Sequence, residues 1–151
     1  GLGQALGFVA QLFDTGDLLE GRFMIEPQIA RMAAEHATND QVACIKELCD
    51  ESERLAEAGE DYSAADTAFH NAIAESSGNL VVPRLMGVLK ASVPLFIDVT
   101  GKKLVEETIR THRDVADAIA SRNPTAAHDA MYLHLVYNRN MIAEGAQEQS
   151  E

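Results

Sequence analysis

The stretch DTAFH, residues 66–70, places a carboxylate and an imidazole four residues apart. Residues at i and i+4 lie one above the other on the same face of an α-helix, so Asp66 and His70 share one stripe of a helix predicted over residues 62–76. Polar groups on a core-facing stripe are costly unless a hydrogen bond or a metal ion satisfies them. These residues alone leave both explanations open. The apolar members of the stripe are Tyr62, Phe69 and Ile73.

The composition favours a helical core. The 151 residues suit one domain with a hydrophobic core of its own. Trp is absent and aromatic residues make up only 5% of the chain, so Ala, Leu, Ile, Val and Met have to fill the interior. Alternating β-branched runs closed by tight turns, the signal of strands, are missing. We therefore predict an all-α fold, an antiparallel bundle of about six helices.

Charge, hydropathy and cysteine usage exclude several classes of protein. The net charge of −12 argues against nucleic-acid binding by this chain alone, because phosphate contacts need clustered Lys and Arg. No apolar run is long enough for a membrane span, and no signal peptide is recognisable. Cys44 and Cys49 lie five apart on a predicted helix and face different directions, so no disulfide is expected. Two free thiols suit a reducing cytoplasm.

The first two helices have recognisable ends. One is predicted from Asp17, as its cap, to His36, and Pro27 either starts a second segment or bends the helix. Thr38 and Gln41 form a predicted capping box at the start of the next helix, which runs to about residue 58. Its acidic side chains are better explained by a solvated helix face than by a protein-binding surface. They are Glu47, Asp50, Glu51, Glu53 and Glu57.

Three more helices follow the one over residues 62–76. One is predicted over residues 80–98, bent or broken at Pro94, and another over residues 103–122. Asn123-Pro124 has the usual order of an N-cap followed by a first-turn proline, which starts the last helix. We expect that helix to give way to a polar tail near Gln147.

Two further histidines repeat the pattern of His70. His112 lies on the apolar stripe of the fifth predicted helix and His134 on that of the sixth. One such histidine is more often a satisfied core residue than a metal ligand. Three of them together with Asp66, all facing the interior of one bundle, predict a metal site built from facing helices. Imidazole suits zinc, nickel, copper and iron, and the carboxylate compensates charge.

The remaining histidines fit no such set. His36 lies at a predicted helix C-terminus, where a cation is favourable. His128 lies six residues before His134, on another face of the last helix. We interpret both as structural or surface residues.

Several motifs, in this order, resemble the FCD domain, the C-terminal effector-sensing domain of the FadR subgroup of GntR-type bacterial transcription regulators. The resemblance covers about residues 16–143 without a large insertion. Each motif alone is weak, and the ordered set is fairly specific. The motifs are Glu20 to Glu26 leading to Ala33-Ala34, Asp66-x-x-x-His70, Ser77-Gly78-Asn79, His112 ahead of Ala118-Ile119, Arg122-Asn123-Pro124 to Ala127, and Met131-x-x-His134-Leu135.

The resemblance implies a bundle of six to seven helices around a central pocket that holds a divalent metal ion and a ligand. Three His and one Asp accept zinc, nickel, manganese or iron, and zinc or nickel is expected first. Arg22 in the first helix would contact a small organic-acid or sugar-acid effector beside the metal. The implied metal ligands are Asp66, His70, His112 and His134.

The resemblance also implies partners outside this sequence. Members of the family act as homodimers and bind operator DNA through an N-terminal winged helix-turn-helix domain, for which this chain has no room. We interpret residues 1–15 as a linker or a remnant of that domain, residues 16–145 as the FCD domain and residues 146–151 as a polar tail. A cytoplasmic location without membrane contact is expected.

Three functions fit a metal site of this kind. We favour a sensor in which the metal and Arg22 bind an acid, so that the chain is not an enzyme. The first alternative is a small metalloenzyme that activates water, for which Glu26 and Glu75 are general-base candidates only by default. The second is a purely structural metal, although structural zinc sites are usually rich in Cys.

Overall fold

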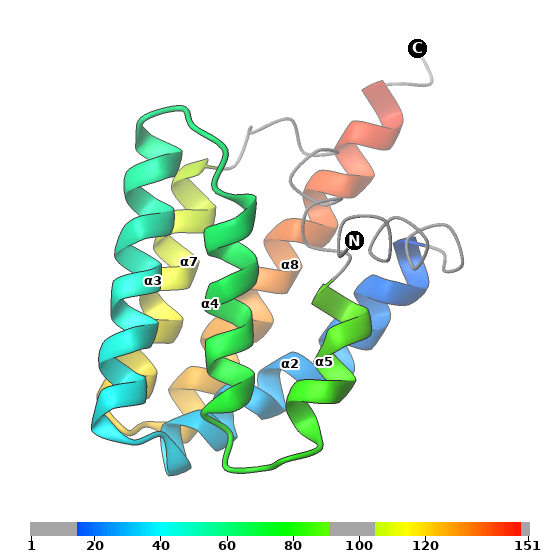
Figure 1. Cartoon of the computed structure of the whole chain (residues 1–151). Helices are drawn as coiled ribbons and strands as arrows, with labels where there is room; N and C mark the ends of the chain where they lie inside the picture. The colour runs from blue at the N-terminus through cyan, green and yellow to red at the C-terminus, as the bar shows by residue number, and fades with distance from the viewer. Residues whose placement is uncertain (1–14, 91–104, 149–151) are drawn as a thin grey trace, which may run out of the picture.

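A computed structural model describes residues 15–90 and 105–148, and in these ranges the chain forms six α-helices and no strand. Successive described helices run in opposite directions (Figure 1), which confirms the predicted all-α antiparallel bundle. The helices are α2 (Thr15–His36), α3 (Asn39–Glu57), α4 (Ser63–Glu75), α5 (Val82–Lys90), α7 (Val105–Ala120) and α8 (Pro124–Glu148).

Helix α2 packs against α4, α5, α7 and α8, and its contact with α8 is the most extensive between described helices. Helices α3 and α4 lie side by side with α7 behind them, and α5 packs on α4 (Figure 1). Alanines allow α2 to approach its neighbours closely: Ala30, Ala33 and Ala34 are at most 1% exposed. Larger side chains from the other helices complete one core. Among them are Ile45, Phe69, Ile73, Met86, Ile119 and Met131.

The predicted caps of two helices are confirmed. The Gln41 backbone N–H donates to Thr38 Oγ1 at 3.1 Å, and the Thr38 backbone N–H donates to Gln41 Oε1 at 2.9 Å. Asn123 Oδ1 accepts from the Ala126 backbone N–H at 3.1 Å at the start of α8. Each bond satisfies one N–H that a helix start would otherwise leave without a partner.

Gly78 allows α4 to end against the last turn of α2. Its φ of +76° is in the left-handed region, which side chains with a Cβ adopt at a cost. A Cβ at this position would also lie 3.0 Å from the Cβ of His36. The Ser77-Gly78-Asn79 motif is therefore explained by the turn that leads out of α4.

Several predicted boundaries need correction. Helix α2 begins at Thr15 and continues through Pro27, so Asp17 lies in its first turn instead of capping it, and no second segment begins at the proline. Helix α5 begins at Val82, two residues later than predicted, because Asn79 Oδ1 accepts from the backbone N–H groups of Val81 and Val82 and keeps residue 80 outside the helix.

The C-terminal end also differs from the prediction, because α8 continues to Glu148 and Gln147 is helical rather than part of a tail. Residues 1–14, the segment 91–104 with Pro94, and residues 149–151 lie outside the described residues. The predictions for them stay predictions.

Predictions about the surface can be compared directly. Cys44 is exposed, Cys49 is buried, and both are free thiols, as predicted. The acidic side of α3 is largely exposed, but Asp50 and Glu53 both accept from Arg113 of α7. None of the helices in the described ranges is long and apolar enough to cross a membrane.

Candidate metal site

The four predicted metal ligands meet inside the bundle. Helix α4 supplies Asp66 and His70, α7 supplies His112 and α8 supplies His134, and each residue is at most 4% exposed. Asp66 Oδ1 lies 3.2 Å from His70 Nε2 and 3.1 Å from His112 Nε2. The amphipathic stripe of each helix carries its polar ligand to the same interior point.

The three imidazoles form a tight group. The ring centroids are 4.5 Å apart for His112 and His134, 5.3 Å for His70 and His134, and 5.4 Å for His70 and His112. One ring nitrogen of each histidine can be chosen so that all three lie within 4.8 Å of one another. Two nitrogens that bind the same metal ion at about 2.0–2.1 Å can be at most about twice that distance apart. Three ring nitrogens this close together therefore suit a single metal ion.

Three polar atoms of this group are buried without a hydrogen bond: Asp66 Oδ1, His70 Nε2 and His112 Nε2. They lie close to one another, but the contacts do not have hydrogen-bond geometry. Leaving such atoms unsatisfied costs about 1–3 kcal/mol each, and each calls for an explanation. A divalent cation among them would satisfy all three at once, so the residues present fit a metal.

The orientation of His134 is set by α7. Thr111 Oγ1 lies 2.7 Å from the Glu107 carbonyl and 2.9 Å from His134 Nδ1. A hydroxyl has one proton, and a carbonyl can only accept, so Thr111 donates to Glu107 and accepts from the Nδ1–H of His134. The tautomer assigned from this network leaves the lone pair of His134 on Nε2.

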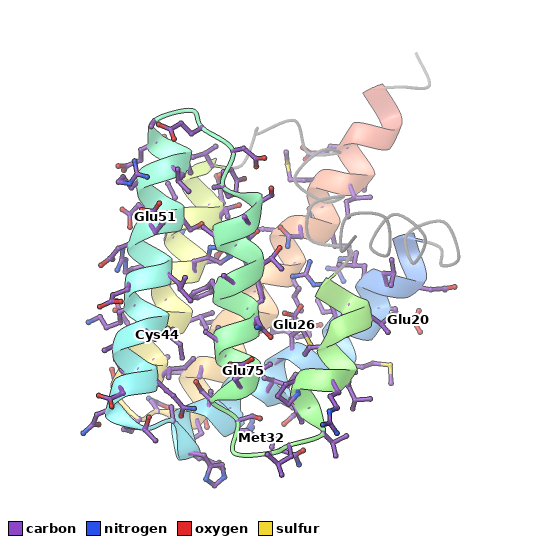
Figure 2. The ribbon with its side chains drawn as sticks, viewed as in Figure 1. Glu20, Glu26, Met32, Cys44, Glu51 and Glu75 are labelled. Atoms are coloured by element: carbon purple, nitrogen blue, oxygen red, sulfur yellow. The ribbon has the colours of Figure 1, made fainter. Side chains whose placement is uncertain are left out.

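A buried ion pair of α2 contacts the group at His70. Arg22 Nε donates to Glu26 Oε2 at 2.5 Å, and Glu26 Oε1 lies 2.7 Å from His70 Nδ1. Arg22 is 1% exposed and Glu26 2%. Figure 2 shows Glu26 toward the middle of the bundle, whereas Glu20, Cys44 and Glu51 lie at its edges.

From the sequence, Glu26 is only a default general-base candidate, with no predicted contact to the metal ligands. A signal was present, because Arg22 and Glu26 are four apart on the face of α2 that also carries Ala30 and Ala33 to the core. An arginine and a carboxylate at that spacing on a buried face indicate an ion pair. The spacing does not reveal that the carboxylate reaches a histidine 44 residues away.

The charges of the site follow from its burial and its close contacts. Burial raises the pKa of Glu26, but Arg22 and His70 outweigh it and bring that pKa down to about 2. Burial also raises the pKa of Asp66, yet His112 and His70 hold it well below its usual value. Burial lowers the pKa of His70, whereas Glu26 and Asp66 raise it to about 9.

His134 has the opposite character. Burial, and then the nearby charges of His112 and His70, hold the pKa of His134 well below its usual value. It is therefore neutral at physiological pH, which is the form that binds a metal. The group as a whole offers two ionised carboxylates and at least one neutral imidazole in a space closed to water.

The other candidates lie elsewhere. His36 is exposed at the end of α2, and His128 is partly exposed with its Nδ1 2.9 Å from Asp129 Oδ1, which confirms their predicted surface roles. Glu75 is exposed and accepts from Asn71 at 3.4 Å. Glu26, the other default general base, is engaged by Arg22 and His70.

A bundle of antiparallel helices with an Asp-and-three-His group at its centre is what the FCD resemblance implied. The model of the FCD domain family matches residues 17–137, and the chain belongs to this family. Among solved structures it is similar to Streptococcus agalactiae GntR, with a TM-score of 0.74 and 33% sequence identity over 83% of this chain and 58% of that one.

Curated relatives also support membership of this family of regulators. The chain is 30% identical to the HTH-type transcriptional regulator LutR of Bacillus subtilis over 86% of this chain and 63% of that protein. It is 28% identical to the uncharacterized HTH-type transcriptional regulator YcbG of the same organism, over 87% of this chain and 55% of that protein. Both relatives are named as transcriptional regulators. The chain spans about half the length of the curated relatives that it matches.

Proposed function

We propose that the chain is the effector-sensing domain of a GntR-type transcription regulator of the FadR subgroup. In this proposal it binds a divalent metal ion through Asp66, His70, His112 and His134. The metal and Arg22 together bind a small carboxylate metabolite, and this binding modulates how the full-length dimer holds its operator DNA.

The unsatisfied atoms of Asp66, His70 and His112 carry the metal assignment. They are buried, Asp66 Oδ1 lies 3.2 Å from His70 Nε2 and 3.1 Å from His112 Nε2, and the atoms come from two helices, α4 and α7. A group stabilised only by its own hydrogen bonds would not leave these atoms without one. Imidazole and carboxylate ligands favour zinc or nickel and also suit iron or manganese.

The nearby arginine supports a carboxylate as the effector. Four protein ligands leave a coordination position open on a metal that prefers five or six. A carboxylate at that position could also pair with Arg22, whose guanidinium carries five N–H donors in a planar fork. Charge-assisted contacts of this kind are about twice as strong as neutral hydrogen bonds.

The burial of the site suggests how binding is transmitted. Arg22 and the four ligands are at most 4% exposed, so an acid reaches them only when the surrounding helices separate. Reclosure around the acid then selects one packing of the helices over another. A coupling of this kind to a second site is allostery in the thermodynamic sense.

The rest of the regulator is inferred from the relatives. They are named HTH-type regulators, and the matched region covers only 55% and 63% of their lengths. We infer that an N-terminal winged helix-turn-helix contacts the operator, that the protein acts as a homodimer, and that it works in the cytoplasm, where its DNA is.

Metal analysis of protein purified without chelator, combined with mass spectrometry of small molecules that accompany it, tests the proposal. We expect about one metal ion per chain, an organic or sugar acid bound with it, and loss of both in His134→Ala. The matched control is His128→Ala, which removes a histidine of the same helix that faces away from the site. No metal in the purified protein, and none taken up on titration with zinc or nickel, would contradict the proposal.

Binding of an acid distinguishes a sensor from a purely structural metal site. We expect sugar acids or hydroxy acids to raise the melting temperature of the zinc-loaded protein, and to have no effect on zinc-free His134→Ala. If no acid of these classes changes the melting temperature of the metal-loaded protein, the metal has a structural role.

A further inference from the structure

Glu26 occupies a position between the arginine and the metal group. Its two oxygens have different partners: Oε2 accepts from Arg22 Nε at 2.5 Å, and Oε1 lies 2.7 Å from His70 Nδ1. All three residues are at most 2% exposed, so water does not compete for these contacts. The position of the carboxylate is therefore fixed by the protein alone.

The contact with Glu26 determines which nitrogen of His70 carries a proton. An ionised carboxylate can only accept hydrogen bonds, so Nδ1 of His70 must be the donor to Oε1. When metal binding removes the second proton of the ring, the lone pair is then on Nε2. That atom lies 3.2 Å from Asp66 Oδ1 and is one of the buried atoms without a hydrogen bond.

We propose that Glu26, held by Arg22, is a positioning residue of the metal centre that keeps His70 in the Nδ1–H form so that Nε2 faces the metal. This inference rests on the proposed function, because it requires the metal. A carboxylate behind a ligating histidine also makes the imidazole a stronger ligand.

His134 has a comparable arrangement with weaker chemistry. Thr111 accepts from its Nδ1–H and leaves Nε2 for the metal, but a neutral hydroxyl does not add charge behind the ring. Two of the three histidines thus donate their Nδ1–H to a residue that would not itself bind the metal. Because Glu26 carries a charge, its contribution to metal affinity should exceed that of Thr111.

The inference gives Arg22 a second task. Besides any contact with an acid, Arg22 holds the carboxylate that holds His70. Removal of Arg22 should therefore weaken metal binding as well as effector binding. A change of effector affinity with no change of metal affinity is not the expected result for this residue.

Glu26→Gln gives the sharpest test. Arg22 can only donate, so it will keep the amide oxygen, and the amide NH₂ will then point at His70 Nδ1. A donor at that place favours the Nε2–H form of the ring, which cannot bind a metal through Nε2. The control is Glu53→Gln, which also removes the charge of an arginine-paired carboxylate but lies on α3 beside Arg113.

The measurement is the zinc affinity of the full chain, by competition with a chromophoric chelator, together with the ¹⁵N spectrum of the imidazoles in the zinc-loaded protein. We expect Glu26→Gln to bind zinc about 10–100-fold more weakly than the unchanged chain, and Glu53→Gln to bind it equally well. In the unchanged chain, the Nδ1–H of His70 should be visible and slow to exchange with water.

The outcomes separate the two proposals. If the unchanged chain binds no zinc, nickel, manganese or iron, the proposed function fails. If it binds zinc and Glu26→Gln binds it with equal affinity and the same imidazole spectrum, this inference is overturned and the proposed function stands. Should Glu26→Gln fail to fold, Glu26→Asp replaces it. The shorter carboxylate keeps the charge but draws back from His70, so zinc binding should weaken, and equal affinity would overturn the inference.

Discussion

Two arginine networks of this chain use the same residue types in different surroundings. Arg22 pairs with Glu26 inside the bundle, where their side chains are 1% and 3% exposed. Arg113 of α7 pairs with Asp50 and Glu53 of α3 at the surface, where the exposed fractions of the three side chains are 32%, 65% and 30%. The first network continues to a histidine of the candidate metal site, and the second ends in solvent.

The difference shows that an ion pair is better judged by its surroundings than by its geometry. A surface pair contributes only about 0–1 kcal/mol, because water and salt screen it. A buried pair is costly to form, but loss of one partner leaves an uncompensated charge and costs about 3–5 kcal/mol. A stable core does not require a buried pair such as that of Arg22 and Glu26, and this agrees with the role in metal and acid binding proposed for it.

Removal of the buried arginine should have the largest effect. Arg22→Met keeps much of the side-chain volume and leaves Glu26 buried beside His70 without its cation. We expect a loss of about 3–5 kcal/mol in the free energy of unfolding, measured by urea denaturation of the metal-free protein. A loss of only about 0–1 kcal/mol, as expected for a surface pair, would show that the two networks contribute equally to stability.

Removal of the metal should lower the stability that the buried site provides and should not change the contribution of the surface network. Zinc at about 100 times its dissociation constant should stabilise the folded chain by about 2.7 kcal/mol, and a chelator should reverse this. Asp66→Asn should abolish the shift, because it removes the charge that two histidines face. Arg113→Met should keep it in full. A zinc-dependent shift that survives in Asp66→Asn would place the metal elsewhere.

Loss of the surface network should be small. Arg113→Met is expected to cost about 0–1 kcal/mol, and sodium chloride should reduce the cost further because these charges are partly exposed. Urea denaturation at low and high salt measures both. A cost near that of Arg22→Met, insensitive to salt, would mean that Arg113 stabilises the packing of α3 on α7 in a way that its exposure does not suggest.

The sequence was informative where one helix contains the whole signal. The stripe from Tyr62 to Ile73 is buried as predicted, and the capping box of Thr38 and Gln41 needs only four consecutive residues. Each ligand could be placed on its own helix for the same reason. That three helices bring them together was inferred from the recurrence of His on apolar stripes and from the family resemblance.

What the sequence did not reveal depends on contacts between distant segments. Glu26 and His70 are 44 residues apart, and Arg113 and Glu53 are 60 apart. Periodicity assigns each of these residues to a face but does not select its partner. The continuous helix through Pro27 is a related case, because packing of α2 on four other helices overrides the local preference for a break.

The smallest expected effect concerns a reporter thiol next to the surface network. Cys49 is 2% exposed on α3, and burial raises its pKa to about 11, while Cys44 is exposed on the same helix. A thiol with a raised pKa has little thiolate at pH 8, and the thiolate is the reactive form. We expect a disulfide reagent to label Cys44 rapidly and Cys49 only when α3 opens.

The labelling rate of Cys49 then compares the two networks in the folded protein. Arg113→Met should raise it, because Arg113 ties α3 to α7 beside this thiol. Zinc should slow the labelling of Cys49 only if opening of α3 also requires the metal site to come apart. If zinc slows the labelling of Cys49 in both the unchanged chain and Arg113→Met, the bundle opens as one unit. The buried network then limits opening of α3 more than the surface network does.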